Sequence, residues 1–274
     1  MNSAPTEPVL VRRARPAEEA EPVRVLLLHG LASGAAVWNG FTALADPAYE
    51  LWTAELPWRG SGVPGWPDRP ADDWVAQAVA ALPGPPDIVV GHSFGANALL
   101  AWLARAETAG HAPRGVVLVS PFYRSQQEQF DWDAISYYLN HFDRILSDGL
   151  RVSSGGRLEP SVQQDMALKV RERIGPYGWM RFFETYLGTP RLPIDRMLMP
   201  FLIIGGETDF AAFPNEAEAL GQVLPDAEVR ILPGVGHFTM VERAAEFSEA
   251  VNGFLSTVTA RPRPGASLSA MEYN

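Results

Sequence analysis

Short runs of apolar residues recur along the chain, and most of them contain no polar position. A strand with one face in water alternates apolar and polar residues, whereas a strand covered on both faces is apolar throughout. Val116 to Val119 and Phe201 to Ile204 show the second pattern. We therefore expect a mostly parallel sheet with both faces covered. The predicted strands are 9–11, 23–28, 49–54, 88–90, 116–119, 201–204 and 228–232.

Segments with helical spacing separate these strands. Trp38, Phe41 and Leu44, for example, fall on one face of a predicted helix. The predicted helices are 35–45, 71–82, 94–108, 214–224 and 240–257. Strands that alternate with helices predict an α/β fold with helices on both faces of the sheet. The loops that follow parallel strands gather at one edge, where ligands bind in such folds.

The pattern changes between residues 121 and 197, where no strand is predicted. Apolar residues there follow helical spacing in three stretches, 131–146, 160–174 and 176–187. This is typical of a helical insertion. We expect a core formed by 1–120 and 198–258, a helical cap over 121–197, and a flexible tail over 259–274, where Pro, Gly, Ser and Ala dominate.

Composition narrows the class of protein. The 274 residues are 47% hydrophobic, which suffices for one domain with an insertion. The net charge of −10 argues against a nucleic-acid surface, and the absence of cysteine excludes disulfides, thiolate metal sites and cysteine nucleophiles. Residues 1–8 show no signal-peptide pattern, and no apolar run reaches the length of a membrane span. We therefore expect a cytoplasmic protein.

The first candidate for chemistry is the sequence Gly91-His92-Ser93-Phe94-Gly95, which lies between a predicted strand and a predicted helix. This is the G-x-S-x-G pattern of a sharp turn that presents a nucleophilic serine. The same pattern also fits an ordinary glycine-rich turn. In the catalytic interpretation, the turn exposes the Ser93 hydroxyl and directs the N–H of Phe94 to the same point.

A serine nucleophile needs a base, and His237 is the best candidate. It follows the last predicted strand in a loop of small residues, Gly234-Val235-Gly236. A histidine on a surface loop is the alternative interpretation. His92 adjoins the serine but should point elsewhere, and we expect His141 to face solvent or pack locally. His111 should lie at the opposite edge of the sheet.

The base in turn needs a carboxylate, for which Asp209 is the candidate and Glu207 the nearest rival. Asp209 follows the strand 201–204 and lies between Ser93 and His237 in chain order. A capping or surface role is the alternative. Related folds can carry the acid after the preceding strand, but this chain has Ser120 and Pro121 there, which favours Asp209.

An oxyanion requires two N–H donors. Phe94 supplies one, and the loop His29-Gly30-Leu31 should supply the other through the N–H of Leu31. In this interpretation His29 is structural and Gly30 allows close approach of the backbone. A simple strand-to-helix turn is the alternative.

Together these residues resemble the α/β-hydrolase superfamily over about residues 9–257. The resemblance is based on Leu28-His29-Gly30, the turn at 91–95, Gly205 to Asp209, and Gly236-His237. It implies an eight-stranded, mostly parallel sheet with a helical cap after the sixth strand, and no metal or cofactor. One loop departs from the family, because Glu55 begins the segment 55–62 where the family often has Asp.

Aromatic residues concentrate in the expected cap. Twelve of the 69 residues from 122 to 190 are aromatic, against 10% of the whole chain. Most should form the core of the cap, and some should face an apolar substrate. The predicted pocket residues are Trp38, Trp58, Phe122, Trp132, Phe182 and Phe238.

These features predict a Ser-His-Asp hydrolase that cleaves an ester or thioester of a bulky apolar, acyl or polyketide-like substrate, which a carrier protein or CoA could bear. Two alternatives stay open. One is a biosynthetic enzyme that releases or cyclises a chain, and the other is a ligand-binding protein of the same fold without hydrolytic activity.

Overall fold

A computed structural model describes residues 9–19, 22–106 and 112–261. Its centre is a sheet that, within these residues, has seven strands in the order β1-β3-β2-β4-β5-β6-β7. The strand β1 pairs antiparallel with β3, and all other pairs are parallel. The strands are β1 (Leu10–Arg15), β2 (Val23–Leu28), β3 (Tyr49–Glu55), β4 (Ile88–His92), β5 (Gly115–Val119), β6 (Phe201–Gly206) and β7 (Ala227–Leu232).

The seven strands correct the expectation of eight. Each of the seven overlaps a strand predicted from the sequence, although β1 continues to Arg15, beyond the predicted 9–11. The eighth was implied only by the family resemblance. Within the described residues no strand precedes β1, and residues 1–8 lie outside them. The expected flexible tail over 259–274 is wrong at its start, because α8 continues to Ala260. Residues 262–274 of this expected tail lie outside the described residues.

Helices cover both faces of the sheet. Alternate residues of one strand reach different cores: Leu26 packs with the cluster under α2 and α3, and Leu27 packs with the cluster under α1 and α8. This explains the runs of consecutive apolar residues in the inner strands β2, β4, β5 and β6. The longer helices of this part are α1 (Asn39–Leu44), α2 (Ala71–Ala80), α3 (Phe94–Ala106), α6 (Pro214–Val223) and α8 (Ala244–Ala260), with the short α7 (Thr239–Glu242) before α8.

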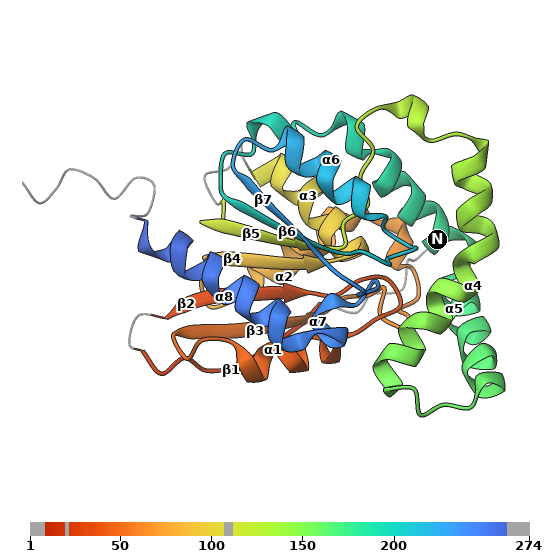
Figure 1. Cartoon of the computed structure of the whole chain (residues 1–274), viewed down its shortest axis with the longest axis horizontal. Coiled ribbons are helices and arrows are strands. Elements are labelled where there is room, and N and C mark those ends of the chain that lie inside the picture. The colour runs from red at the N-terminus through yellow and green to blue at the C-terminus, as the bar shows by residue number, and fades with distance from the viewer. Residues whose placement is uncertain (1–8, 20–21, 107–111, 262–274) are drawn as a thin grey trace, which may run out of the picture.

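Two long helices, α4 (Trp132–Ser154) and α5 (Pro160–Leu187), lie between β5 and β6 in the chain. They therefore follow the fifth described strand, whereas the family resemblance implied a cap after the sixth. Figure 1 shows them together beyond one end of the sheet. The Asp131 side chain accepts a hydrogen bond from the N–H of Ala134 and caps α4. Gly175 interrupts α5 with a φ of 63°, just before Pro176, which matches the two stretches expected from the sequence. Short 3₁₀ helices, η1 (Ala35–Trp38), η2 (Trp66–Asp68), η3 (Gln127–Gln129), η4 (Thr189–Arg191) and η5 (Ile194–Arg196), complete the described elements.

The helices of the described ranges also bear on membrane insertion. None of them combines the length and the apolar character that crossing a bilayer requires.

Candidate active site

Ser93 stands at the turn between β4 and α3 in a strained conformation, with a φ of 56°. Its N–H donates to the carbonyl of Val119, which fixes the turn against β5. The glycines on either side are sterically required. A Cβ on Gly95 would lie 2.5 Å from the carbonyl oxygen of His29, and one on Gly91 would lie 2.9 Å from the Cα of Ala96. The turn therefore has the tight geometry expected from the sequence pattern.

The structure brings Ser93, His237 and Asp209 into one hydrogen-bonded chain. The Nε2 of His237 lies 2.9 Å from the Oγ of Ser93, and its Nδ1 lies 2.8 Å from the Oδ2 of Asp209. Because a carboxylate only accepts, Nδ1 carries the proton and Nε2 is free to accept the serine proton. The other oxygen of Asp209 accepts from the N–H groups of Ala211 and Ala212, at 2.8 and 3.0 Å.

The topology explains this convergence. The three residues follow β4, β6 and β7, whose carboxyl ends lie at the same edge of the parallel sheet. The loops of Asp209 and His237 touch directly, because a Cβ on Gly206 would lie only 2.1 Å from the carbonyl oxygen of Gly236. Glu207 does not reach the histidine and accepts a hydrogen bond from the N–H of Gly234 instead.

Two polar side chains hold the backbone of His237, and the sequence did not reveal either role. The carbonyl of His237 accepts hydrogen bonds from the Nε2 of His92 at 3.0 Å and from the Oγ of Ser120 at 3.2 Å. Burial lowers the pKa of His92 well below its ordinary value, so this ring is neutral. His92 was expected to point elsewhere. Its ring instead lies 4.9 Å from that of His237, and its position at the end of the buried strand β4 was the available signal.

The expected oxyanion donors, Leu31 and Phe94, flank the serine. Neither N–H donates to another group of the described chain. Gly30 allows the close approach, since a Cβ there would lie 2.8 Å from the Cβ of Ser93. His29 is buried and structural, as expected: its Nε2 accepts from the N–H of Leu56 at 2.9 Å, and burial lowers its pKa.

A cavity of about 370 Å³ opens on Ser93 and His237. Three of the six expected pocket residues line it, namely Phe122, Phe182 and Phe238. The two phenylalanines of the inserted segment pack edge to face, 5.0 Å apart, while the Phe238 ring lies 5.3 Å from that of His237.

The prediction was wrong for the three tryptophans expected in the pocket, because none of them lines the cavity. Trp38 is buried in the cluster under α1 and α8, against Phe247. Trp58 is buried in the core, where its Nε1 donates to the carbonyl of His29 and its ring packs on Phe94. Trp132 is 81% exposed at the first turn of α4 and does not line the cavity. Aromatic size alone did not indicate which side of its element each residue faces.

The remaining histidine on the insertion packs locally, as expected. The ring of His141 stacks on Tyr137, with centroids 4.3 Å apart, and its Nδ1 lies 2.7 Å from the Tyr137 carbonyl. His111 lies outside the described residues.

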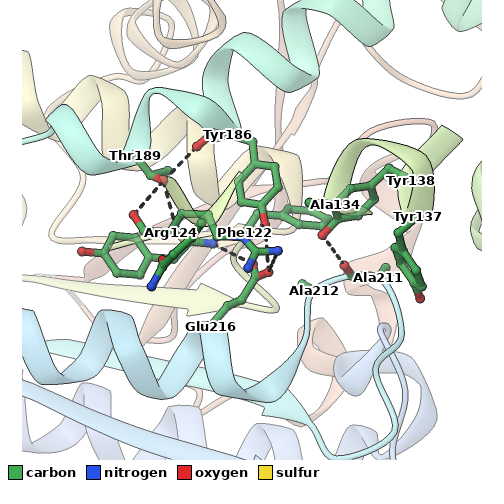
Figure 2. Close-up of polar contacts among 12 residues, drawn as sticks. Phe122, Arg124, Ala134, Tyr137, Tyr138, Tyr186, Thr189, Ala211, Ala212 and Glu216 are labelled. Carbon is green, nitrogen blue, oxygen red and sulfur yellow. Dashed lines mark hydrogen bonds and ion pairs between the residues drawn. The ribbon is translucent and has the colours of Figure 1, made fainter. Parts of the chain in front are cut away.

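A buried polar cluster next to the site was not expected from the sequence. Figure 2 shows Glu216, from α6, between Arg124 and Tyr186. The carboxylate accepts from the N–H of Tyr123 at 2.9 Å and from the hydroxyl of Tyr186 at 2.8 Å, and it lies 3.3 Å from Nη2 of Arg124. Burial raises the pKa of Glu216 to about 7, against the lowering effect of Arg124.

This cluster joins the segment between β5 and β6 to α6, near Asp209. Tyr186 comes from α5, and Arg124 from the segment after β5. Beside it, the hydroxyl of Tyr138 donates to the carbonyl of Ala211 (Figure 2). The N–H of Ala211 in turn donates to Asp209. An acid in the first turn of a helix ordinarily looks like a partner of the helix dipole, so the sequence carried no clear signal for this role.

Comparisons with known proteins agree with this architecture. No curated protein matches the chain. Among solved structures, it resembles the meta-cleavage product hydrolase from Pseudomonas fluorescens IP01, with a TM-score of 0.66 and 19% identity over 91% of this chain and 95% of that one. It also resembles the enol-lactonase from Burkholderia xenovorans LB400, with a TM-score of 0.64 and 19% identity over 92% of this chain and 97% of that one. For the esterase RhEst1 from Rhodococcus sp. ECU1013 the TM-score is 0.64 and the identity 20%, over 91% of this chain and 95% of that one. At such identities these structures show the shared fold.

The family assignment comes from a sequence model. The model described as the alpha/beta hydrolase family matches residues 25–250, which include the Ser93 turn and the loops of Asp209 and His237. This range covers well over half of the chain, so the protein belongs to the α/β-hydrolase family.

Proposed function

We propose that this protein is a serine hydrolase that cleaves carboxylic esters or thioesters of bulky apolar acids through an acyl-enzyme. One observation carries the proposal: Ser93, His237 and Asp209 form a continuous hydrogen-bonded chain whose serine end opens on a cavity. A serine hydroxyl becomes nucleophilic when an adjacent base can take its proton, and His237 is placed to do so.

In the first half-reaction, the Oγ of Ser93 attacks the carbonyl carbon while its proton passes to Nε2 of His237. The carbonyl oxygen becomes an oxyanion facing the N–H groups of Leu31 and Phe94. Asp209 keeps the proton of His237 on Nδ1 and stabilises the imidazolium. The tetrahedral adduct then collapses, and the leaving oxygen or sulfur takes the proton from Nε2.

In the second half-reaction, water takes the place of the leaving group. Its proton passes to Nε2 as its oxygen attacks the acyl carbon. Collapse of this adduct releases the acid and returns the proton to Ser93. The preference for apolar acids is supported by the cavity, which is lined mainly by aromatic and aliphatic side chains.

Labelling with a fluorophosphonate probe tests the proposal directly. We expect the wild type to be labelled at Ser93, which mass spectrometry of the peptide locates, and the Ser93→Ala variant to stay unlabelled. Ser256→Ala, which changes an exposed serine on α8, is the matched control and should be labelled like the wild type. A folded wild type that is not labelled and cleaves no acyl ester of any chain length overturns the proposal in favour of a ligand-binding protein. Matched oxygen esters and N-acetylcysteamine thioesters then show which leaving group is preferred.

A further inference from the structure

The cavity has a buried aromatic end and an exposed mouth. Phe122, Tyr138, Phe142 and Phe182 line it and are buried, with at most 6% of each side chain exposed. The hydroxyl of Tyr138 is turned toward Ala211, so this residue contributes its ring to the wall.

Other lining residues are exposed and small or neutral, namely Ala36, Asn39, Ser153 and Val241. They come from η1, α1, the end of α4 and α7, and they surround the access to solvent. Ser93 and His237 line the same cavity. A substrate bound across Ser93 therefore places one part in the buried end and the other toward the mouth.

The order of product release decides which part is which. The alcohol leaves while the acyl group is still attached to Ser93. An alcohol in the buried end would be trapped behind the acyl-serine, whereas an alcohol at the mouth can leave and admit water. The acyl group therefore occupies the aromatic end.

The lining carries no formally charged side chain. Among the 24 lining residues of the described chain there is no Asp, Glu, Lys or Arg. Two arginines of α4, the helix that forms one wall, are engaged elsewhere: Arg144 lies over the ring of Phe210, and Arg151 pairs with Asp148. The nearest buried carboxylate, Asp209, lies behind His237 and would repel an anion.

We infer that this site selects uncharged acyl groups, aromatic or branched, that bind in the aromatic end with the alcohol at the mouth, and rejects acyl groups of the same shape that carry a carboxylate. This inference rests on the proposed function and names its substrate class. The physical reason for this selectivity is that a carboxylate moved from water into a cavity with apolar walls and no cation loses its hydration and gains no charged partner.

Three p-nitrophenyl esters test the inference on the wild type. Their acyl groups are 3-(4-isopropylphenyl)propanoyl, 3-(4-carbamoylphenyl)propanoyl and 3-(4-carboxyphenyl)propanoyl, which have nearly the same shape. We expect kcat/KM for the carboxylate to be at least about 100-fold below that for the carbamoyl ester at pH 7.5. The carbamoyl ester controls for polarity without charge.

The outcomes separate the two proposals. A carboxylate ester hydrolysed within 10-fold of the carbamoyl ester overturns the substrate class and leaves the hydrolase intact. If no ester is cleaved and Ser93 is not labelled by a fluorophosphonate, the hydrolase itself fails and the inference falls with it.

A variant with a new cation gives a second, independent arm. Ile145 lines the cavity and packs against its aromatic cluster, so Ile145→Lys supplies the missing partner for a carboxylate. We expect it to raise the ratio of carboxylate to carbamoyl kcat/KM by at least about 10-fold. Leu139→Lys, on the outer side of the same helix where Leu139 is 61% exposed, is the matched control and should leave the ratio unchanged. An unchanged ratio in a folded Ile145→Lys protein contradicts the inference.

Discussion

Replacement of Glu216 by glutamine should change how stability depends on pH. Glu216 is buried, with 3% of its surface exposed, and its pKa is raised from 4.5 to about 7. Because the folded state holds the proton more tightly than the unfolded chain, this group contributes full stability below pH 4.5. The contribution is lost as pH rises to about 7. At about 1.4 kcal/mol per pH unit, the loss is about 3 kcal/mol.

Glutamine cannot ionise, so Glu216→Gln removes this pH dependence. It also disturbs the hydrogen bonds to Tyr123 and Tyr186, which adds an offset of about 1–3 kcal/mol that does not depend on pH. The quantity to measure is therefore how the difference in unfolding free energy between Glu216→Gln and wild type changes with pH. We expect the unfolding free energy of the variant, relative to wild type, to rise by about 3 kcal/mol between pH 4.5 and pH 8.

Urea unfolding followed by tryptophan fluorescence at several pH values measures this difference. Glu218→Gln, on the exposed side of the same helix, is the matched control and should leave the pH dependence of wild type unchanged. If the difference between Glu216→Gln and wild type stays constant within about 1 kcal/mol over this range, the reasoning is refuted. The pKa of Glu216 in the folded protein would then not be raised much above its value in the unfolded chain.

Three further changes test other parts of the site. Asp209→Asn should lower kcat, measured by steady-state kinetics, by about 10³–10⁴-fold, because the amide no longer fixes the histidine tautomer. Circular dichroism should show that this variant still folds, and a loss of kcat under 10-fold would contradict the proposed role of the acid. Gly95→Ala should lower the free energy of unfolding by about 1–3 kcal/mol and remove most of the activity, because the new Cβ meets the His29 carbonyl oxygen at 2.5 Å. Gly253→Ala, where the new Cβ has no atom within 4 Å, is the control and should stabilise the protein by about 0.5–1 kcal/mol in the same thermal unfolding assay. Ala36→Trp should narrow the mouth and reduce kcat/KM for esters of bulky alcohols by about 10-fold while sparing ethyl esters; a matching loss for bulky acyl groups would reverse the assignment of the two ends.

The sequence was most informative where a property is decided locally. The continuous apolar runs predicted strands covered on both faces, and neighbours such as Leu26 and Leu27 do enter opposite cores. The sequence predicted that Ser93, Asp209 and His237 lie close together, because each lies in the turn or loop that follows a parallel strand, and parallel strands end at one edge. Such reasoning needs only the order of the elements.

Residues whose environment depends on distant contacts were predicted poorly. Trp38 belongs to the expected amphipathic helical region, but the same spacing is compatible with either face of the sheet, and it packs against Phe247 more than 200 residues later. Trp132 falls on the first turn of α4 and is left outside its packing. Periodicity indicates that a face is apolar without indicating what covers it.

The contact between α4 and the loop that carries Asp209 illustrates this limit and has a mechanistic consequence. Ala211 donates its N–H to Asp209 and accepts, on its carbonyl, the hydroxyl of Tyr138, which forms part of the cavity wall. A single peptide segment thus joins Asp209, which is hydrogen-bonded to His237, to a residue of the aromatic end of the cavity. Any movement of α4 that displaces Tyr138 also acts on the donors that hold Asp209. We therefore expect substitutions in this wall to alter kcat as well as substrate preference. Ala211 makes both hydrogen bonds through its backbone, so its side chain gave no signal in the sequence.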